Sequence, residues 1–500
     1  MGKPSLDKDL KKVGHLEKAT GSLAQSLAAP GLLAVFMAGS IVTASLALGD
    51  SSHTLLVVFA AVVAAYMALN VGANDVANNM GPAVGSRVLS MAGAIAIAAI
   101  AETAGAILAG GDVVNTVAKD LIVKDHGLAT DSFIMVMMAA LLAAGMWLHL
   151  ATFLGAPVST THSIVGAVLG SGAMAAGVEA VNWAVIGKIA VSWVISPVCG
   201  GLIAAFLLGS VKWLVIFRDD RIMAAKRWVP ILVALMAGVF SMYMASKGLS
   251  RIWKPDAITV LAFGVAFFVL GYAVSRPLVV RRATVIANTR KDVAGCFNVP
   301  LIFAVGLLSF AHGANDVANA VGPLAAIVSV AQTEAGVEAQ VALPMWVLAI
   351  GALGISLGLT LFGPRLIRTV GEKITKMDPI RAYCVALSAA ITVLVASAMG
   401  LPVSSTHVAI GAVFGVGYLR EILTNKGVPN LAVKPRSVFL KPSHLNGTPE
   451  EAILNYAKRE KRRLVRRQYV FGIAAAWVVT VPAAALLAAA LYASMRWVTG

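Results

Sequence analysis

The segment Gly72-Ala73-Asn74-Asp75-Val76-Ala77-Asn78 occurs twice in this chain, because the same seven letters return at residues 313–319. In both places Gly-Pro follows after two further residues. A second segment, Pro-Val-Ser-Thr-Thr-His at 157–162, returns as Pro-Val-Ser-Ser-Thr-His at 402–407, at nearly the same spacing from the first. Two long motifs repeated in one order and at one spacing indicate an internal duplication. We call them the GANDVAN and the Pro-Val-Ser segments.

The composition places the chain in a lipid bilayer. Of its 500 residues, 59% are hydrophobic and 13% are charged, and the mean hydropathy is +0.83. Soluble domains carry about a quarter charged residues. A helix needs about 20 apolar residues to cross the hydrocarbon core, where no water pairs with the backbone. Eleven runs suit this role: 31–49, 53–73, 88–110, 132–157, 189–211, 229–246, 257–275, 299–314 with its GANDVAN continuation, 341–363, 382–400 and 469–495.

Each Pro-Val-Ser segment predicts a helix that begins inside the membrane. Proline suits the first turn of a helix and hydroxyl residues suit its cap. The fold we expect is therefore an all-α, polytopic membrane transporter with about 11 spans plus two broken or re-entrant elements. A helix start offers free N–H groups and a positive dipole end, which favour an anion.

The duplication divides the chain into two related halves. We expect a cytoplasmic N-terminal segment at 1–30, an extra transmembrane helix at 31–52, repeat 1 at 53–217, a connecting segment with two transmembrane helices at 218–298, and repeat 2 at 299–498 with a cytoplasmic insertion at 420–468.

Lys and Arg in the connections predict the orientation of the halves. Cytoplasmic loops retain positive charge. If the N-terminus is cytoplasmic and each Pro-Val-Ser element crosses the membrane once, four basic stretches lie inside and the two repeats are inverted, which is the arrangement we expect; the exception is 247–254. If the elements return to their own side, the first two stretches lie outside instead. The four stretches are 218–228, 276–291, 365–381 and 420–468.

The polar residues of the GANDVAN segments are candidate cation ligands. Polar side chains inside membrane spans are costly, and they usually mark function. Residues i and i+4 share a helix face, so Asn74 lies with Asn78 and Asn315 with Asn319. Carboxylate and amide oxygens are hard-cation ligands, and the low charge suits sodium. The sodium candidates are Asn74, Asp75, Asn315 and Asp316. A helix cap or an amide contact between helices is the structural alternative.

The hydroxyls of the Pro-Val-Ser segments, with the last amide of each GANDVAN segment, are candidate anion ligands. Two opposed helix ends meeting at the midplane would hold a small oxyanion such as phosphate or sulfate. The alternative is an ordinary buried cap. The candidates are Ser159, Thr160, Thr161, Ser404, Ser405, Thr406, Asn78 and Asn319.

Three titratable residues in apolar sequence remain. His162 and His407 end the Pro-Val-Ser segments, and we expect them to be packing residues. Glu102 is the only acid in the run 88–110, which makes it a candidate for coupling; the alternative is a hydrogen bond between helices. It has no acidic counterpart in the second copy, so we expect the first repeat alone to provide its role.

Several other functional classes have little support. The net charge of +16 comes from loop residues and indicates topology rather than nucleic-acid binding. The three cysteines show neither metal-ligand nor disulfide spacing. No motif of a common catalytic fold is present, so we do not expect an enzyme. An anion-binding membrane sensor is the alternative from another class, although duplicated halves favour a carrier.

The doubled segments, with Glu102-Thr103-x-Gly105 in the first copy, resemble the inorganic phosphate transporter family over about 53–217 and 299–495. The resemblance implies inverted repeats, alternating access and symport of phosphate with Na⁺ or H⁺. It also implies that the four sodium candidates above bind sodium and that the six hydroxyl residues above contact phosphate. Animal members carry a second membrane glutamate where this chain has Ala386. Retention of Asn319-Ala320 favours sodium as co-substrate, with no other cofactor. Proton-coupled phosphate transport and sulfate transport remain alternatives. We expect a multi-pass protein of the inner (plasma) membrane, and assembly as a homodimer is left open.

Overall fold

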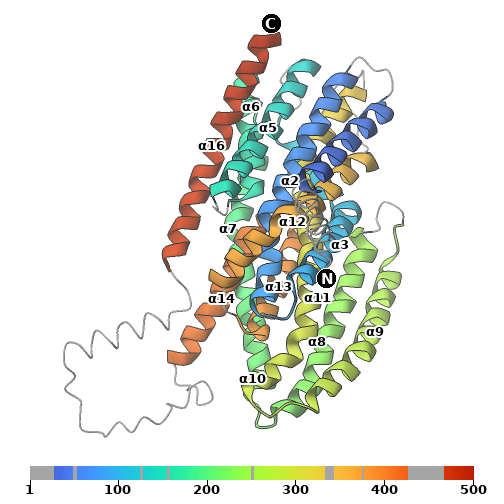
Figure 1. The fold of residues 1–500 in the computed structure, drawn as a ribbon, viewed down its shortest axis with the longest axis vertical. Helices are drawn as coiled ribbons and strands as arrows, with labels where there is room; N and C mark the ends of the chain where they lie inside the picture. The colour runs from blue at the N-terminus through green and yellow to red at the C-terminus, as the bar shows by residue number, and fades with distance from the viewer. Residues whose placement is uncertain are drawn as a thin grey trace, which may run out of the picture.

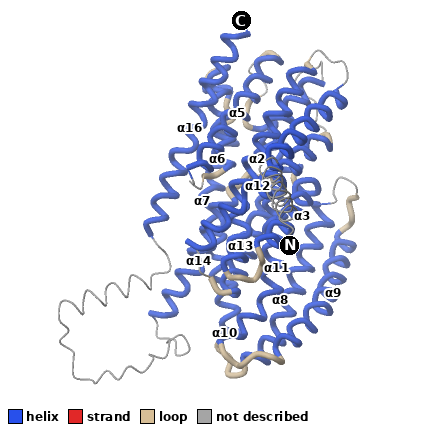
Figure 2. The backbone as a smooth tube through the Cα atoms, viewed as in Figure 1, coloured by secondary structure: helices blue, strands red, loops and turns tan. Residues whose placement is uncertain are grey.

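The computed structural model of the protein describes residues 28–48, 53–123, 128–154, 158–248, 253–332, 343–373, 377–425 and 467–499. Helices make up nearly all of the described chain (Figure 2). The β pairing that the described residues contain is one isolated bridge between Ile122 and Val181. Most of the predicted N-terminal segment 1–30 and of the insertion 420–468 lies outside the described residues.

Eleven of the described helices are long and apolar enough to cross a membrane, one for each predicted run. This confirms the all-α membrane fold. The first of them covers Ala28–Leu48. The other helices and helical turns used below are α2 (Thr54–Gly85), α3 (Met91–Ala109), α5 (Thr130–Leu154), α6 (Thr160–Ala176), α7 (Trp183–Val211), η3 (Lys212–Ile216), α8 (Arg221–Tyr243), α9 (Ala257–Ala283), α10 (Arg290–Val293), α11 (Asn298–Gln332), α12 (Met345–Lys373), α13 (Pro379–Ala398), α14 (Ser405–Asn425) and α16 (Arg467–Thr499).

The helices that carry the motifs lie at the centre of the bundle. α2 packs against α12 and α11 against α3, and in each of these pairs the first-copy helix meets a second-copy helix. α6 packs against α16, and α14 packs against α7. Figure 1 shows α8 and α9 side by side on one flank and α16 on the opposite flank. Most side chains of α9 are exposed, as expected for a helix that faces lipid.

The GANDVAN segments lie inside long helices. The sequence placed the first one near the end of its span, but α2 continues to Gly85 and α11 continues to Gln332. Both helices then contain a proline, Pro82 or Pro323. A proline lacks the N–H that would bond to the carbonyl four residues earlier. The main-chain carbonyls of Asn78 and Asn319 are therefore released from the helical hydrogen-bond pattern.

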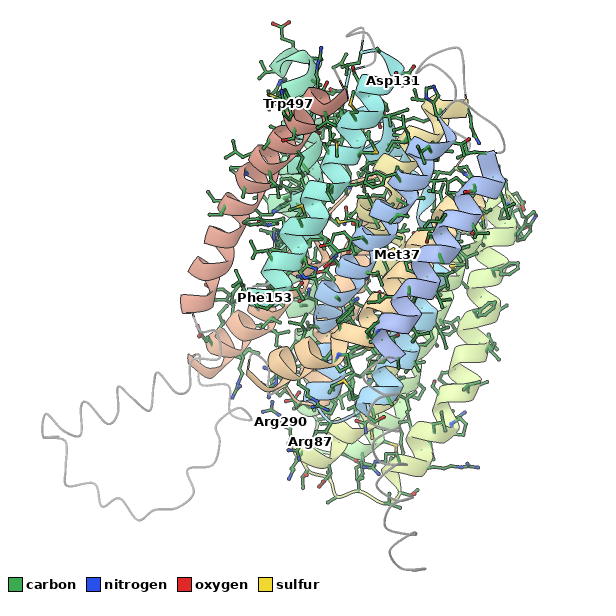
Figure 3. The ribbon with its side chains drawn as sticks, turned by 45° about the horizontal axis from the view of Figure 1, so that its top comes forward. Met37, Arg87, Asp131, Phe153, Arg290 and Trp497 are labelled. Atoms are coloured by element: carbon green, nitrogen blue, oxygen red, sulfur yellow. The ribbon has the colours of Figure 1, made fainter. Side chains whose placement is uncertain are left out.

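The basic connections gather at one end of the bundle. The Arg221 N–H donates to Asn288 Oδ1, with N and O 3.0 Å apart, which joins the stretches 218–228 and 276–291. Residues from the beginning of α13 and the end of α14 line one cavity with Arg290, so this helix pair returns to the end where it began. Figure 3 shows Arg87 and Arg290 at this end, and Asp131 and Trp497 at the other.

Candidate functional site

Two helix starts in the middle of the bundle carry the Pro-Val-Ser hydroxyls. The Ser159 hydroxyl accepts the backbone N–H of His162 at 3.2 Å and caps α6. The Ser404 hydroxyl accepts the N–H of His407 at 3.3 Å in the same way, at the start of α14. The predicted helix starts are present. In this structure the two serines act as buried helix caps, which was the alternative to anion binding.

The next hydroxyl of each segment meets the GANDVAN carboxylate of its own copy. Thr160 donates to Asp75 Oδ2 at 3.0 Å, and Ser405 donates to Asp316 Oδ2 at 3.0 Å. All four side chains are buried. The cation and anion candidates of each copy are therefore in direct contact.

Other bonds cross between the copies. Thr406 donates to Asp75 Oδ1 at 3.3 Å and accepts the Asn78 amide at 2.8 Å. The Asn319 amide donates to Thr160 at 3.2 Å and to Thr161 at 3.1 Å. The four repeated segments thus form one site rather than two separate ones.

The first amide of each GANDVAN segment contacts a neighbouring helix. Asn74 donates to Thr152 at 3.1 Å, and Asn315 donates to Ser397 at 3.0 Å. The Asn315 Oδ1 atom also accepts the backbone N–H of Val403 at 3.3 Å. In this structure the two amides hold α5 and α13 beside the site. This is the structural alternative given above, an amide contact between helices.

His312 lies between the acidic side chains of the site. Its Nε2 atom is 2.8 Å from Asp316 Oδ2 and 3.6 Å from Asp75 Oδ2. Its Nδ1 atom is 3.2 Å from Glu102 Oε2, and the other Glu102 oxygen accepts the Asn79 amide at 2.9 Å. His312 and the three carboxylates are buried and have no exposed surface. None of their described ion pairs involves Lys or Arg.

The two copies are not equivalent around this histidine. A methyl group on Gly313 would overlap the carbonyl of Glu102, and one on Gly72 would overlap the carbonyl of Ile355. Because Gly72 and Gly313 hold the same place in the repeat, Ile355 is the counterpart of Glu102. The next residues, Thr103 and Ser356, correspond in the same way, and their hydroxyl oxygens are 2.6 Å apart.

Three polar residues on one side of the site thus have apolar counterparts on the other side. His312, Glu102 and Asn79 correspond to Val71, Ile355 and Ala320. Glu102 has no acidic counterpart at Ile355, as expected, but its carboxylate contacts His312 of the second copy because α3 packs against α11. Sequence reasoning missed His312 and Asn79. The sequence indicated them, because both lie next to a GANDVAN segment at positions where the two copies differ.

The histidines of the Pro-Val-Ser segments pack against each other. The ring centroids of His162 and His407 are 4.6 Å apart, and the rings meet edge to face. The Trp193 ring lies 3.8 Å from the His162 ring. This agrees with the expected packing role, and it brings the two helix starts together.

The side chains gathered here are of the kinds that can bind a cation or an anion. Three buried carboxylates share one imidazole, and buried charges in membrane spans need partners. The carboxylate oxygens of Asp75 and Asp316 and the imidazole of His312 lie within 4.8 Å of one another, close enough to surround one ion. The amides and hydroxyls next to them supply donors for an oxyanion.

Comparisons with known proteins agree with this chemistry. Residues 71–488 match the model of the phosphate transporter family. A Helicobacter pylori protein that carries the name phosphate permease is 42% identical, with 98% of this chain and 99% of that protein covered. The chloroplastic inorganic phosphate transporter 2-1 of Arabidopsis thaliana is 38% identical over 71% of this chain and 65% of its own. A solved structure described as the sodium-dependent phosphate transporter matches with a TM-score of 0.75 and 32% identity, covering 89% of this chain and all of that one.

Proposed function

The chain belongs to the phosphate transporter family, and we propose from this that it imports inorganic phosphate by symport with sodium. The family consists of transporters rather than enzymes, and the eleven apolar helices make this chain a multi-pass membrane protein. We place it in the inner (plasma) membrane with its basic end in the cytoplasm, because short cytoplasmic connections retain Lys and Arg.

The contact between hydroxyls and carboxylates carries the proposal. The hydroxyls of Thr160 and Ser405 donate hydrogen bonds to Asp75 and Asp316 in this structure. A sodium ion held by Asp75 or Asp316, with Asn74 or Asn315 beside it, replaces the hydroxyl as the partner of the carboxylate. The released hydroxyls then donate to phosphate, together with the amides of Asn78 and Asn319. Sodium and phosphate binding are linked because both depend on the release of the same two hydroxyl groups from the carboxylates.

The arrangement of the helix pairs supports inverted repeats and alternating access. In Figure 1, α5 and α6 lie toward the end that carries the C-terminus, whereas α13 and α14 lie toward the basic end. Their tips meet at the site, where the Thr161 hydroxyl donates to the carbonyl of Val403 at 3.1 Å and the ring centroids of His162 and His407 are 4.6 Å apart. Rocking of the two pairs about this shared site would expose it to one side at a time.

Proton coupling is the second candidate, and the contact between His312 and Glu102 favours it. A titratable pair beside Asp316 could carry a proton in place of a sodium ion. This version uses the polar side of the site alone, whereas sodium binding uses the GANDVAN carboxylates of both copies.

Sodium dependence in a hydroxyl variant tests the proposed link. We expect Ser405→Ala to raise the phosphate concentration and the sodium concentration that give half-maximal uptake, each by about tenfold. One hydrogen bond to a charged group contributes about 1.5–3 kcal/mol. Ser494→Ala is the control, because its hydroxyl is exposed and donates to the carbonyl of Ala490 in its own helix. The assay is uptake of labelled phosphate into proteoliposomes. A Ser405→Ala protein with weaker phosphate saturation and unchanged sodium saturation would contradict the link.

Labelled phosphate counterflow separates a carrier from an anion sensor. A carrier loaded with unlabelled phosphate accumulates labelled phosphate from outside, whereas a sensor binds it without accumulation. Competition by sulfate in the same vesicles tests the substrate. We expect Asp316→Asn to weaken the preference for phosphate, because the carboxylate can accept the proton that hydrogen phosphate carries and sulfate lacks.

A further inference from the structure

A small basic cavity lies at the end of the bundle where α7, α10, α13 and α14 meet. Leu208, Ile216 and Ile380 form its apolar wall. Its polar lining consists of four cations and one carboxylate, from Lys212, Arg290, Asp378, Arg381 and Arg420. We call this cavity the Lys212 pocket. It has no part in the transport site, because about 15 residues of helix, or roughly 20 Å, separate Ser405 from Arg420 along α14.

Lys212 is the residue that the rest of the fold does not explain. Only 3% of it is exposed, and its Nζ atom has no hydrogen-bond partner among the described residues. Burying an ammonium group without a partner is strongly unfavourable. A group that is retained under these conditions points to a partner that binds from outside the chain.

The carboxylate of the pocket is already engaged. Asp378 Oδ2 accepts the Arg381 Nε–H at 2.9 Å and lies 2.9 Å from Arg381 Nη2. Asp378 Oδ1 accepts the backbone N–H of Arg381 at 2.9 Å and caps α13. Although burial opposes it, the charge of Arg381 with these bonds holds the pKa of Asp378 below its usual 3.8. Asp378 is therefore ionised at neutral pH, and the four cations still leave the pocket with an excess of positive charge.

The residues next to the pocket are typical of the membrane surface. Lys212 begins the π-helical turn η3, which the Phe217 N–H closes on the Lys212 carbonyl at 2.8 Å. The next residue, Trp213, is 66% exposed, and the Arg218 guanidinium lies over its ring at 5.5 Å. Exposed tryptophan beside arginine is typical of the headgroup region, and basic pockets between transmembrane helices bind phosphate headgroups there.

We propose that the Lys212 pocket binds a phosphate group, presented either by the head of an anionic phospholipid or by free phosphate. Arginine side chains match the oxygens of a phosphate with paired N–H donors, and Lys212 adds a point charge from the buried side. The ligand would join α7 and α10 to the base of the α13–α14 pair.

Native mass spectrometry of the full-length protein in detergent tests this proposal. One arm adds phosphatidylglycerol, with phosphatidylcholine as the uncharged comparison, and the other arm adds inorganic phosphate. The mass of the retained adduct distinguishes the two sources. The pocket variants are Lys212→Met, which replaces the buried charge by an apolar chain of similar length, and Arg420→Gln, in case the first variant folds poorly. Lys291→Gln is the matched control, because Lys291 is exposed and adjacent to Arg290 in the chain.

We expect the wild type and Lys291→Gln to retain one more phosphatidylglycerol, or one more phosphate, than the pocket variants do. The apparent affinity for this adduct should fall about tenfold or more in Lys212→Met and Arg420→Gln. Equal retention by all four proteins in both arms would overturn the proposal. So would an equal loss in Lys291→Gln, since that result would reflect surface charge alone. Binding is read directly, so the result does not depend on which ion drives transport.

Discussion

The contact between His312 and Glu102 gives the sharpest prediction about the site. The His312 Nδ1 atom is 3.2 Å from Glu102, and Nε2 is 2.8 Å from Asp316, with no exposed surface on any of the three. His312→Gln removes the imidazole from the three buried carboxylates. Breaking a buried ion pair from one side costs about 3–5 kcal/mol, so the free energy of unfolding should fall by about that amount.

The second variant shows whether this cost comes from the unpaired charge. Glu102→Gln removes the charge but keeps an oxygen that accepts the Asn79 amide. The loss of stability in the double variant should be smaller than the sum of the two single losses by about 0.5–3 kcal/mol, which is the coupling expected for side chains in contact. Denaturant titration in mixed micelles measures all four proteins of the cycle, with Ser494→Ala as the control. Effects that add within about 0.5 kcal/mol would refute the reasoning.

Three further predictions concern packing, the contacts between the copies, and pH. Gly313→Ala should lower thermal stability and uptake, because its methyl group overlaps a carbonyl of α3, whereas Gly187→Ala, with open space around it, should change neither. Asn319→Ala should raise the phosphate concentration for half-maximal uptake about tenfold, since its amide reaches two hydroxyls of the other copy. Asp378 has a lowered pKa because of Arg381, so its contribution to stability is present at neutral pH and is lost as the pH falls below 3.8. Melting curves against pH should show this loss in the wild type and not in Asp378→Asn, and parallel curves would contradict it.

The fold could largely be predicted because membrane spans depend on length and hydropathy. Each of the eleven predicted runs corresponds to one apolar helix. The helix ends were less accurate, since α2 and α11 continue through the polar GANDVAN segments, where hydropathy falls but the helix does not end. The amides and carboxylates of those segments bond to side chains on other helices, and a hydropathy pattern does not contain these partners.

Most of the site could be predicted because the two copies agree, whereas Glu102 was predicted as the only acid in an apolar run. Repetition identified Asp75, Asp316 and the hydroxyls, and the structure brings them into contact. His312 is a single histidine in an apolar run, and it differs from Val71 at the same place in the first copy. Its meaning depends on the packing of α3 against α11, which puts Glu102 next to it. Such a contact between distant segments cannot be read from either segment alone.

Phosphate uptake under separately imposed gradients tests the central claim most directly. Purified protein in proteoliposomes is given an inward sodium gradient at equal pH, or a pH gradient in sodium-free buffer. We predict that labelled phosphate accumulates with the sodium gradient and not with the pH gradient. Accumulation driven by the pH gradient without sodium would contradict sodium symport and would transfer the coupling role to His312 and Glu102.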